Sequence, residues 1–238
     1  MNVAIVFARG PEKSRRNVNL YRVDGRPLIS FSIDAALKSP SIHRVYVCTD
    51  DAETAEIAQG MSCETIPRPP ETAGAEVGGA IHAAGQVVLE RHPALTNLAI
   101  LSGNTSMISS YLIEKSLDLF YRRPAARSLL TVWQARHDHP YYAFSRTGQG
   151  LAPLLSERDE KPVYFFDGCL CLIRREVIGH SCFGNHRWWL GLPDCVLLVR
   201  PWPTGRDVHD SYGLALARWW TENALIDIAQ EDTQWDEK

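Results

Sequence analysis

The stretch AIVFARGPEKSRRN, Ala4–Asn17, joins an apolar strand pattern to a strongly basic turn. The run Val3–Phe7 is apolar and mostly β-branched, which predicts a buried strand. The turn that follows carries four cations and one acid: Arg9, Lys13, Arg15, Arg16 and Glu12. Such a turn is suited to a polyphosphate, because its backbone N–H groups and arginine side chains can bond phosphate oxygens. The charge pattern alone also fits a solvated surface loop.

Two common phosphate-binding motifs are absent from the sequence. No GK[ST] follows the first glycine, and no GxGxxG occurs along the chain. P-loop and dinucleotide chemistry are therefore not predicted.

The composition is that of an ordinary globular protein. The chain has 238 residues, 45% of them apolar and 22% charged, which predicts one domain over residues 1–238. The net charge of −3 predicts no general affinity for nucleic acid or membranes, and no run has the pattern of a signal peptide or membrane span. None of the six cysteines forms a CxxC pair, so we expect buried thiols in a cytoplasmic protein rather than a zinc site.

The first half of the chain alternates strand and helix patterns. Strands are predicted at residues 2–8, 43–49, 97–103 and 128–135, and helices at 27–39, 51–60, 110–120 and, near the end of the chain, about 211–228. This order predicts an α/β fold with a mostly parallel, Rossmann-like wound sheet and helices on both faces. Ligands bind beyond the carboxyl ends of such strands, so the turns at Arg9, Thr49–Asp50 and Gly103–Asn104 should converge on one cleft.

The pattern changes in the second half. From His137 to about Pro162 the chain is rich in aromatic residues, glycine, proline and charge, which predicts a β-hairpin that leaves the wound sheet. The run VYFFDGCLCLIRREVI, 163–178, then predicts a strand, a turn and a second strand. We expect residues 137–175 to form a β-rich excursion from the domain.

Several segments resemble, in order, the acylneuraminate cytidylyltransferase family, the CMP-sialic acid synthetases. ARGPEKSRRN is similar to the A-R-G-G-S-K-x-x-x-x-K-N loop of that family, and the next segments resemble its G-x-P-L-I helix and V-S-T-D-D strand end. IPRPPETA is similar to its R-P-x-E-L-A segment, and LSGNTSM stands where members carry L-Q-P-T-S-P or L-Y-G-N-V-P. HPYYAF, ERDEKPVYFFDGCLCLIRREV and RDVHDSYGLALA parallel its H-P, R-Q-x-x-P, N-G-A-x-Y and D-I-D-T blocks. The resemblance spans nearly the whole chain and implies a nucleotidyltransferase-type fold.

The resemblance implies that the basic turn binds the triphosphate of CTP. Arg9, Lys13 and Arg16 would hold the phosphates and, with Asp207, form the catalytic set. The residues implied to bind the nucleotide are Ala8, Arg9, Gly10, Asn17, Arg68 and Asn104.

The resemblance also implies a Mg²⁺ cofactor, because transfer at the α-phosphorus builds charge on phosphate oxygens. The D-x-D metal pair of the family corresponds to Asp207 and His209, with Asp210 beside them. Imidazole is a poor ligand for this hard cation, so either Asp210 substitutes or the site is weakened. Asp210 or Ser211 would also suit a cap for the last helix.

The implied reaction transfers CMP from CTP to an acidic sugar of the nonulosonic type and releases pyrophosphate. Arg158 would pair with the carboxylate of the sugar, and His139, Tyr142 and Asp167 would complete the acceptor site. Tyr142 replaces a lysine of the family and Asp167 an asparagine, so the acceptor could differ from sialic acid. In proteins that it resembles, the excursion reaches a partner, which implies a homodimer with shared active sites.

Two alternatives remain open. The acceptor could be a Kdo-like acid or a phosphonate, since related cytidylyltransferases activate both kinds. The chain could instead be a catalytically degenerate homologue that binds a nucleotide or sugar. The basic turn is shorter than the family pattern, Glu12 brings a carboxylate near the phosphates, and His209 stands in the metal pair.

Overall fold

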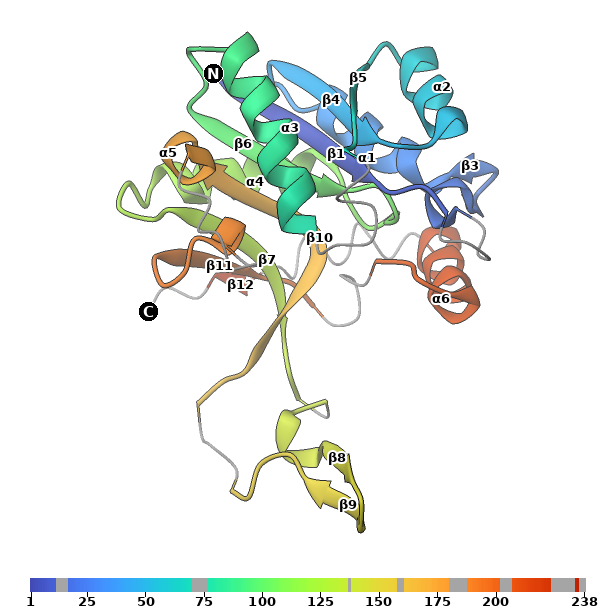
Figure 1. Ribbon diagram of the computed structural model, residues 1–238, viewed down its shortest axis with the longest axis vertical. Coiled ribbons are helices and arrows are strands. Elements are labelled where there is room, and N and C mark those ends of the chain that lie inside the picture. Colours follow the sequence, from blue (N-terminus) through green and yellow to red (C-terminus); the bar gives the residue numbers. More distant parts are fainter. Residues whose placement is uncertain are drawn as a thin grey trace.

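The computed structural model describes residues 1–11, 17–69, 77–136, 138–157, 161–179, 188–201, 207–223 and 234–235. In these residues the main sheet has eight strands in the order β12-β11-β7-β10-β6-β1-β4-β5 (Figure 1). Their bounds are β1 Asn2–Ala8, β4 Arg44–Thr49, β5 Glu64–Pro67, β6 Asn97–Ser102, β7 Ser128–Gln134, β10 Tyr164–Arg174, β11 Cys195–Val199 and β12 Gln234–Trp235.

Most neighbouring strands of this sheet run parallel. β1 pairs in parallel with β4 and β6, β4 with β5, and β7 with β11. The exceptions are β10, which is antiparallel to both β6 and β7, and β12, which is antiparallel to β11. The predicted α/β fold with a mostly parallel wound sheet is confirmed.

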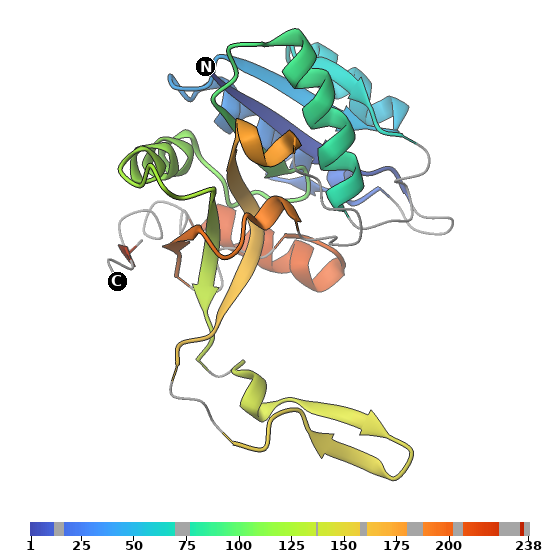
Figure 2. The same ribbon diagram turned by 60° about the vertical axis from the view of Figure 1, so that its left-hand side comes forward.

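Helices cover both faces of the sheet, as predicted (Figures 1 and 2). The helices are α1 Leu28–Leu37, α2 Ala52–Gly60, α3 Val77–Arg91, α4 Ser110–Tyr121, α5 Arg175–Gly179 and α6 Ser211–Glu222. Short 3₁₀ turns occupy Val18–Leu20, Pro140–Tyr142 and Trp188–Leu190. None of the helices in the described ranges combines the length and apolar character needed to cross a membrane.

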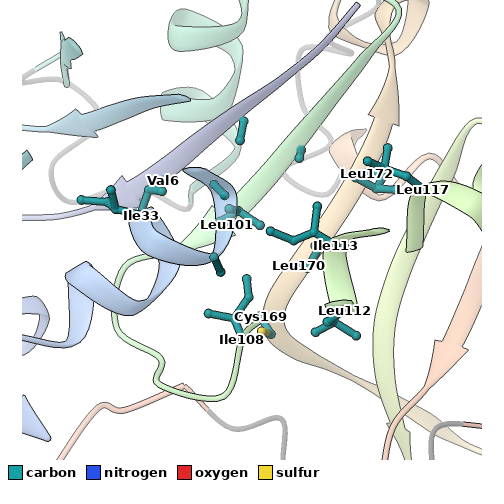
Figure 3. Packing of buried hydrophobic residues seen from close by; sticks show 14 of the residues in the cluster. Val6, Ile33, Leu101, Ile108, Leu112, Ile113, Leu117, Cys169, Leu170 and Leu172 are labelled. Carbon is teal, nitrogen blue, oxygen red and sulfur yellow. The ribbon is translucent and has the colours of Figure 1, made fainter. Parts of the chain in front are cut away.

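The core lies in two layers, one on each side of the sheet. On one side α1 and α4 pack on β1, β6 and β10, where Val6, Ile33 and Leu101 lie close together (Figure 3). On the other side α3 and α5 pack on the same strands through residues such as Ile81 and Ile178. Burial on both faces explains why β1 is apolar along its whole length rather than alternating.

Polar caps set where three helices begin. The side chains of Asp51, Ser109 and Asp210 accept hydrogen bonds from backbone N–H groups in the first turns of α2, α4 and α6. The predicted starts of these helices are therefore close to the observed ones. α1 begins at Leu28, one residue later than expected, because Pro27 takes the cap position.

A β-hairpin projects from the body of the molecule between β7 and β10 (Figures 1 and 2). It consists of β8 Phe144–Thr147 and β9 Gly150–Pro153, paired antiparallel. A second small sheet pairs β2 Arg22–Val23 with β3 Arg26–Pro27.

The prediction of two strands in residues 163–178 is wrong. This segment forms one long strand, β10, whose register with β7 shifts between Phe166 and Cys171, followed by α5. Gly168 lies inside the irregularity with a φ of +74°, a conformation that glycine adopts without steric cost. Because β10 belongs to the main sheet, the excursion ends before it rather than at Arg175.

Candidate active site

A cleft of about 500 Å³ opens at the carboxyl ends of β1 and β6. Its lining residues are Phe7, Arg9, Gly10, Pro11, Asn17, Val18, Asn19, Arg68, Val77, Ile81, Ile100, Leu101, Ser102, Asn104, Phe166, Gly168, Trp189, Asp207 and His209. The predicted turns after β1 and β6 line it directly, and the turn after β4 supports it through Asp50. The expected convergence holds for the turns after β1 and β6, whereas Thr49 and Asp50 do not line the cleft themselves.

The beginning of the basic turn is held from two sides. The Gly10 N–H donates to Asp50 Oδ1 at 2.6 Å, and the Asn19 side-chain amide donates to the Arg9 carbonyl at 2.8 Å. Ala8 ends β1 and is fully buried. These bonds fix the backbone at the mouth of the cleft, while Lys13 and Arg16 lie outside the described residues.

Asn17 anchors the end of the basic turn to α2. Its amide nitrogen donates to Asp51 Oδ2 at 2.9 Å and to Thr54 Oγ1 at 3.0 Å. Its amide oxygen accepts from the backbone and side chain of Asn19 at 3.0 and 2.7 Å. Asn17 lines the cleft, but its side chain is engaged in positioning the turn; nucleotide contact by this residue stays a prediction.

Two arginines bring positive charge to the cleft. Arg9 is exposed, whereas Arg68 is buried in the wall, where its backbone N–H donates to the Thr49 carbonyl at 3.0 Å. Burial lowers the pKa of the Arg68 guanidinium; the charges of Cys48 and Asp50 oppose this effect, and the charge of Arg9 adds to it. An anion bound between them would relieve this repulsion, so the pair suits a phosphate group.

The opposite side of the cleft is built around Asp207. Its Oδ2 accepts from Asn104 Nδ2 at 3.3 Å and lies 2.9 Å from His209 Nε2. Two further hydrogen bonds tie Asn104 to the same loop. The Asn104 side-chain amide donates to the Val208 backbone carbonyl, and the Val208 N–H donates to the Asn104 backbone carbonyl. The hydrogen bond to Asp207 raises the pKa of His209. The predicted residues Asn104, Asp207 and His209 therefore meet at one point.

The three predicted metal ligands have different roles in the structure. Asp210 caps α6, with its Oδ1 accepting from the Gly213 N–H at 2.8 Å, and His209 pairs with Asp207. In the described part of the chain, no group of three or more His, Cys, Asp or Glu side chains is arranged to hold a metal ion. Mg²⁺ is commonly held by one or two carboxylates, with substrate phosphates and water completing its shell. Asp207, which lines the cleft, fits that role for an ion that arrives with a triphosphate.

The predicted acceptor residues are not brought together. Asp167 is buried, and its carboxylate is already paired to Arg200 at 2.8 Å. His139 and Tyr142 lie at the base of the projecting hairpin and line neither this cleft nor the pocket that adjoins it. Arg158 lies outside the described residues.

The cleft also has an apolar wall, which was not among the predicted site features. Val77 and Ile81 reach it from α3, while Phe166 and Trp189 meet edge to face at 5.4 Å. A wall of this kind suits the flat face of a nucleotide base. From the sequence, Trp188–Trp189 fits either a stacking platform for a base or an anchor in the core or a subunit interface, and the second is the preferred interpretation.

Comparison with known proteins gives sequence matches to part of the chain. Residues 3–75 match the family model described as cytidylyltransferase. A stretch of 71 residues is 35% identical to the N-acylneuraminate cytidylyltransferase of Escherichia coli O18:K1:H7 (strain RS218 / NMEC). That stretch is 30% of this chain and spans only 17% of the relative.

Solved structures match over nearly the whole chain. A CMP:2-keto-3-deoxy-manno-octonic acid synthetase complexed with CTP has a TM-score of 0.69 at 16% identity, covering 94% of this chain and 99% of that one. The 4-diphosphocytidyl-2C-methyl-D-erythritol synthase of Anaerococcus prevotii DSM 20548 has a TM-score of 0.68 at 9% identity, covering 93% and 98%. At these identities the likeness shows a common nucleotidyltransferase fold. The cleft described above thus lies in a fold shared with these two proteins.

Proposed function

We propose that this chain is a divergent member of the acylneuraminate cytidylyltransferase family and that it transfers CMP from CTP to an acidic sugar; the family-model match and the partial sequence identity support this. The observation that carries the proposal is the cleft itself. Two arginines, a fixed backbone turn, an apolar wall and Asp207 line one cleft. That arrangement suits a nucleoside triphosphate with its base on the apolar wall and its phosphates between Arg9 and Asp207.

In the proposed reaction a hydroxyl of the acceptor attacks the α-phosphorus of CTP in line with the leaving group. The new P–O bond forms as the bond to the β-phosphate breaks, and pyrophosphate leaves with the electron pair. Arg9, with Lys13 and Arg16, would neutralise the charge on the leaving phosphates, while the buried Arg68 favours the anion deeper in the cleft. Holding both reactants in this geometry is most of the catalytic task.

Mg²⁺ is proposed as the cofactor, with Asp207 as its protein ligand. When bound, it would supply a Lewis acid for the charge that develops on the phosphate oxygens. Asn104 donates to the same carboxylate and thereby fixes its orientation. His209 competes for that carboxylate, so metal binding would require the pair to separate or to share the aspartate.

The finer identity of the acceptor rests on the sequence resemblance. An acidic sugar of the nonulosonic type is the first candidate, with Arg158 as the partner of its carboxylate. A Kdo-like acid is the second, and the fold similarity to a synthetase for 2-keto-3-deoxy-manno-octonic acid favours including it. A phosphonate is the third. The pairing of His209 with Asp207 also keeps open a degenerate homologue that binds CTP without turnover.

We further propose that the protein is a homodimer and works in the cytoplasm. The projecting hairpin exposes Phe144 and Leu151, whose side chains are 62% and 73% accessible, and a second copy would cover them. The five described cysteines are free thiols, which suits a reducing compartment.

Pyrophosphate release tests this function. The protein is incubated with CTP, Mg²⁺ and, in separate reactions, N-acetylneuraminic acid, 2-keto-3-deoxy-manno-octonic acid or 2-aminoethylphosphonate. Release is expected with at least one sugar acid, and Asp207→Asn should slow it by about 100-fold or more. The control is Asp118→Asn, an exposed carboxylate on α4 paired with Arg122, which should leave the rate unchanged. Pyrophosphate release only with the phosphonate would mean that the acceptor is a phosphonate rather than a sugar acid. CTP binding without any release would favour the degenerate homologue.

A further inference from the structure

A second pocket of about 460 Å³ adjoins the first cleft. It lies between β7, β10 and α6, and its aromatic walls include Trp133, Phe165, Tyr212 and Trp220. Phe166, Asp207 and His209 line both pockets. A ligand in the second pocket would therefore meet a ligand in the first at the Asp207–His209 pair.

We propose that this second pocket binds the ring of the acceptor sugar acid against its aromatic walls, with the indole N–H of Trp220 donating to a ring or hydroxyl oxygen. The inference rests on the proposed function, because it places the acceptor beside the nucleotide cleft. It adds the surface that recognises the ring and names Trp220 and Tyr212 as determinants of specificity.

The walls of the pocket are suited to a sugar ring. Trp133 and Phe165 stack at a centroid distance of 4.5 Å and an interplanar angle of 17°, which gives a flat surface where β7 and β10 pair. Tyr212 and Trp220 face the pocket from α6. The C–H face of a pyranose is apolar and packs on aromatic rings, while its hydroxyls remain at the edge for hydrogen bonds.

Trp220 provides a polar group that no described residue uses. Its Nε1 atom is buried and has no hydrogen-bond partner among the described residues, although the ring contacts Trp219 edge to face at 5.9 Å. A buried N–H without an acceptor costs free energy, and such a group in a native pocket calls for an explanation. An oxygen of a bound sugar would supply the acceptor.

The charges of the pocket point to recognition of the ring rather than of the acid group. Its described lining contains no lysine or arginine. Asp167 is neutralised by Arg200, and Asp210 is engaged in capping α6. The carboxylate of the acceptor therefore has to be recognised outside this lining, and the pocket itself selects a ring with an apolar face.

Indole N–H resonances test the proposal directly. The chain has seven tryptophans, and Trp220→Phe and Trp219→Phe assign the two neighbouring signals. N-acetylneuraminic acid and 2-keto-3-deoxy-manno-octonic acid are each titrated alone, and CTP is titrated separately. We expect at least one sugar acid, but not CTP, to shift the Trp220 signal.

Affinities for the same sugar acids then separate the two tryptophans. Trp220→Phe keeps an aromatic ring but removes the donor, and should weaken sugar-acid binding about five- to tenfold. Tyr212→Ala, at an 84% exposed position where misfolding is not expected, should weaken it several-fold. The matched control Trp219→Phe, at a position outside the pocket lining, should stay within about twofold.

The proposal is overturned if neither sugar acid moves the Trp220 signal, or if Trp220→Phe binds the sugar acids as tightly as Trp219→Phe does. A failure of CTP to bind is a different result. It would remove the proposed transferase function, while the titrations with sugar alone would still decide the role of the pocket.

Discussion

At the scale of single residues, Gly168 links the central sheet to the candidate site. Its φ of +74° is in the left-handed region, and a Cβ built there would lie 2.9 Å from Asp207 Cγ. The Gly168 carbonyl also accepts a hydrogen bond from Ser102 Oγ. Glycine is therefore required both by the backbone conformation and by the close approach of the proposed metal ligand.

Replacement of Gly168 by alanine should impair turnover as well as stability. The matched control is Gly25→Ala, because Gly25 has a similar φ of +71° but nothing within 4 Å of its Cβ position. Both variants should lose about 1 kcal/mol of unfolding free energy from the left-handed backbone. Only Gly168→Ala should displace Asp207, and we expect its pyrophosphate release to fall at least about tenfold. Equal turnover in the two variants would contradict this account of Gly168.

Asp167 and Arg200 form a buried ion pair beneath the same bulge. The Arg200 guanidinium donates to Asp167 Oδ2 at 2.8 Å and to the Met107 carbonyl at 2.5 Å. Asp167 Oδ1 accepts from Thr131 Oγ1 and from the Cys169 N–H. The pair thus ties together β7, β10 and the end of β11, and a charge left alone there would have no access to water.

Arg200→Met should destabilise the protein strongly, because it leaves the Asp167 carboxylate buried without its partner. The expected loss is about 3–5 kcal/mol of unfolding free energy in urea titrations. The double variant Asp167→Asn/Arg200→Met should lose clearly less than the sum of the two single variants. Additive losses would mean that the two charges are not coupled.

At the scale of elements, the sequence predicts most of the sheet because burial and capping are local signals. The apolar run of β1 and the acid at Asp51 before α2 each mark an element without reference to the rest of the chain. β10 has no such signal, since its bulge at Gly168 has the local pattern of a turn between two strands. Only pairing with β6 and β7 makes it one strand.

The candidate site, like the sheet, could be predicted from the sequence only in part. Arg9, Gly10, Arg68, Asn104 and Asp207 follow strand ends or matched motifs, and the structure places them in one cleft. The burial of Asp167 could not be foreseen, because its partner Arg200 is 33 residues away in the sequence. The apolar wall and the second pocket both depend on segments that are far apart in the sequence: the wall forms where α3, β10 and Trp189 meet, and the pocket where β7, β10 and α6 meet.

Glu114 on α4 holds the connection between α1 and β4. Its carboxylate accepts hydrogen bonds from Ser39 Oγ, from the Ser41 N–H at 3.1 Å and from Ser41 Oγ at 2.6 Å. Burial raises the pKa of Glu114, but these hydrogen bonds outweigh it, so the net effect is a pKa below the ordinary value of 4.5. Its stabilising effect is therefore fully present above about pH 4.5 and is lost as the pH falls through the lowered folded-state pKa.

Glu114→Gln should reduce the unfolding free energy at pH 7 by about 1 kcal/mol or less, since the side chain is partly solvated. The difference from the wild type should shrink as the pH is lowered below about 4.5 and through the lowered folded-state pKa of Glu114, where the glutamate itself becomes neutral. Urea unfolding at a series of pH values measures both effects, with Glu56→Gln on the exposed side of α2 as the control. A difference that does not change with pH would show that the charge of Glu114 is not involved.

At the scale of the whole molecule, the projecting hairpin carries its large exposed apolar side chains on one face. Its register places Phe144 and Leu151 on the same side, together with Arg146, whereas Ser145 and Thr147 lie on the other. The apolar side chains are exposed in the single chain. This asymmetry supports the proposal that a second copy packs on that face.

Leu151→Asp should convert the proposed dimer into a monomer, because it replaces an exposed apolar side chain of this face by a carboxylate. Ser145→Asp adds the same charge on the opposite side of the hairpin and should leave the dimer intact. Analytical ultracentrifugation at several protein concentrations measures the molar mass of each variant in solution. A monomeric wild type, or equal masses for the two variants, would contradict the proposal.

The central claim is that the cleft binds CTP through its basic turn, and calorimetry with CTP, with and without Mg²⁺, tests it most directly. The variants are Arg9→Ala and a charge-matched control, Arg44→Ala, which is exposed at the opposite end of β4. We predict Mg²⁺-dependent binding that Arg9→Ala weakens about tenfold or more, a loss of about 1.4 kcal/mol, while Arg44→Ala stays near the wild type. No binding, or equal effects of the two substitutions, would mean that this fold is present without the nucleotide chemistry proposed for it.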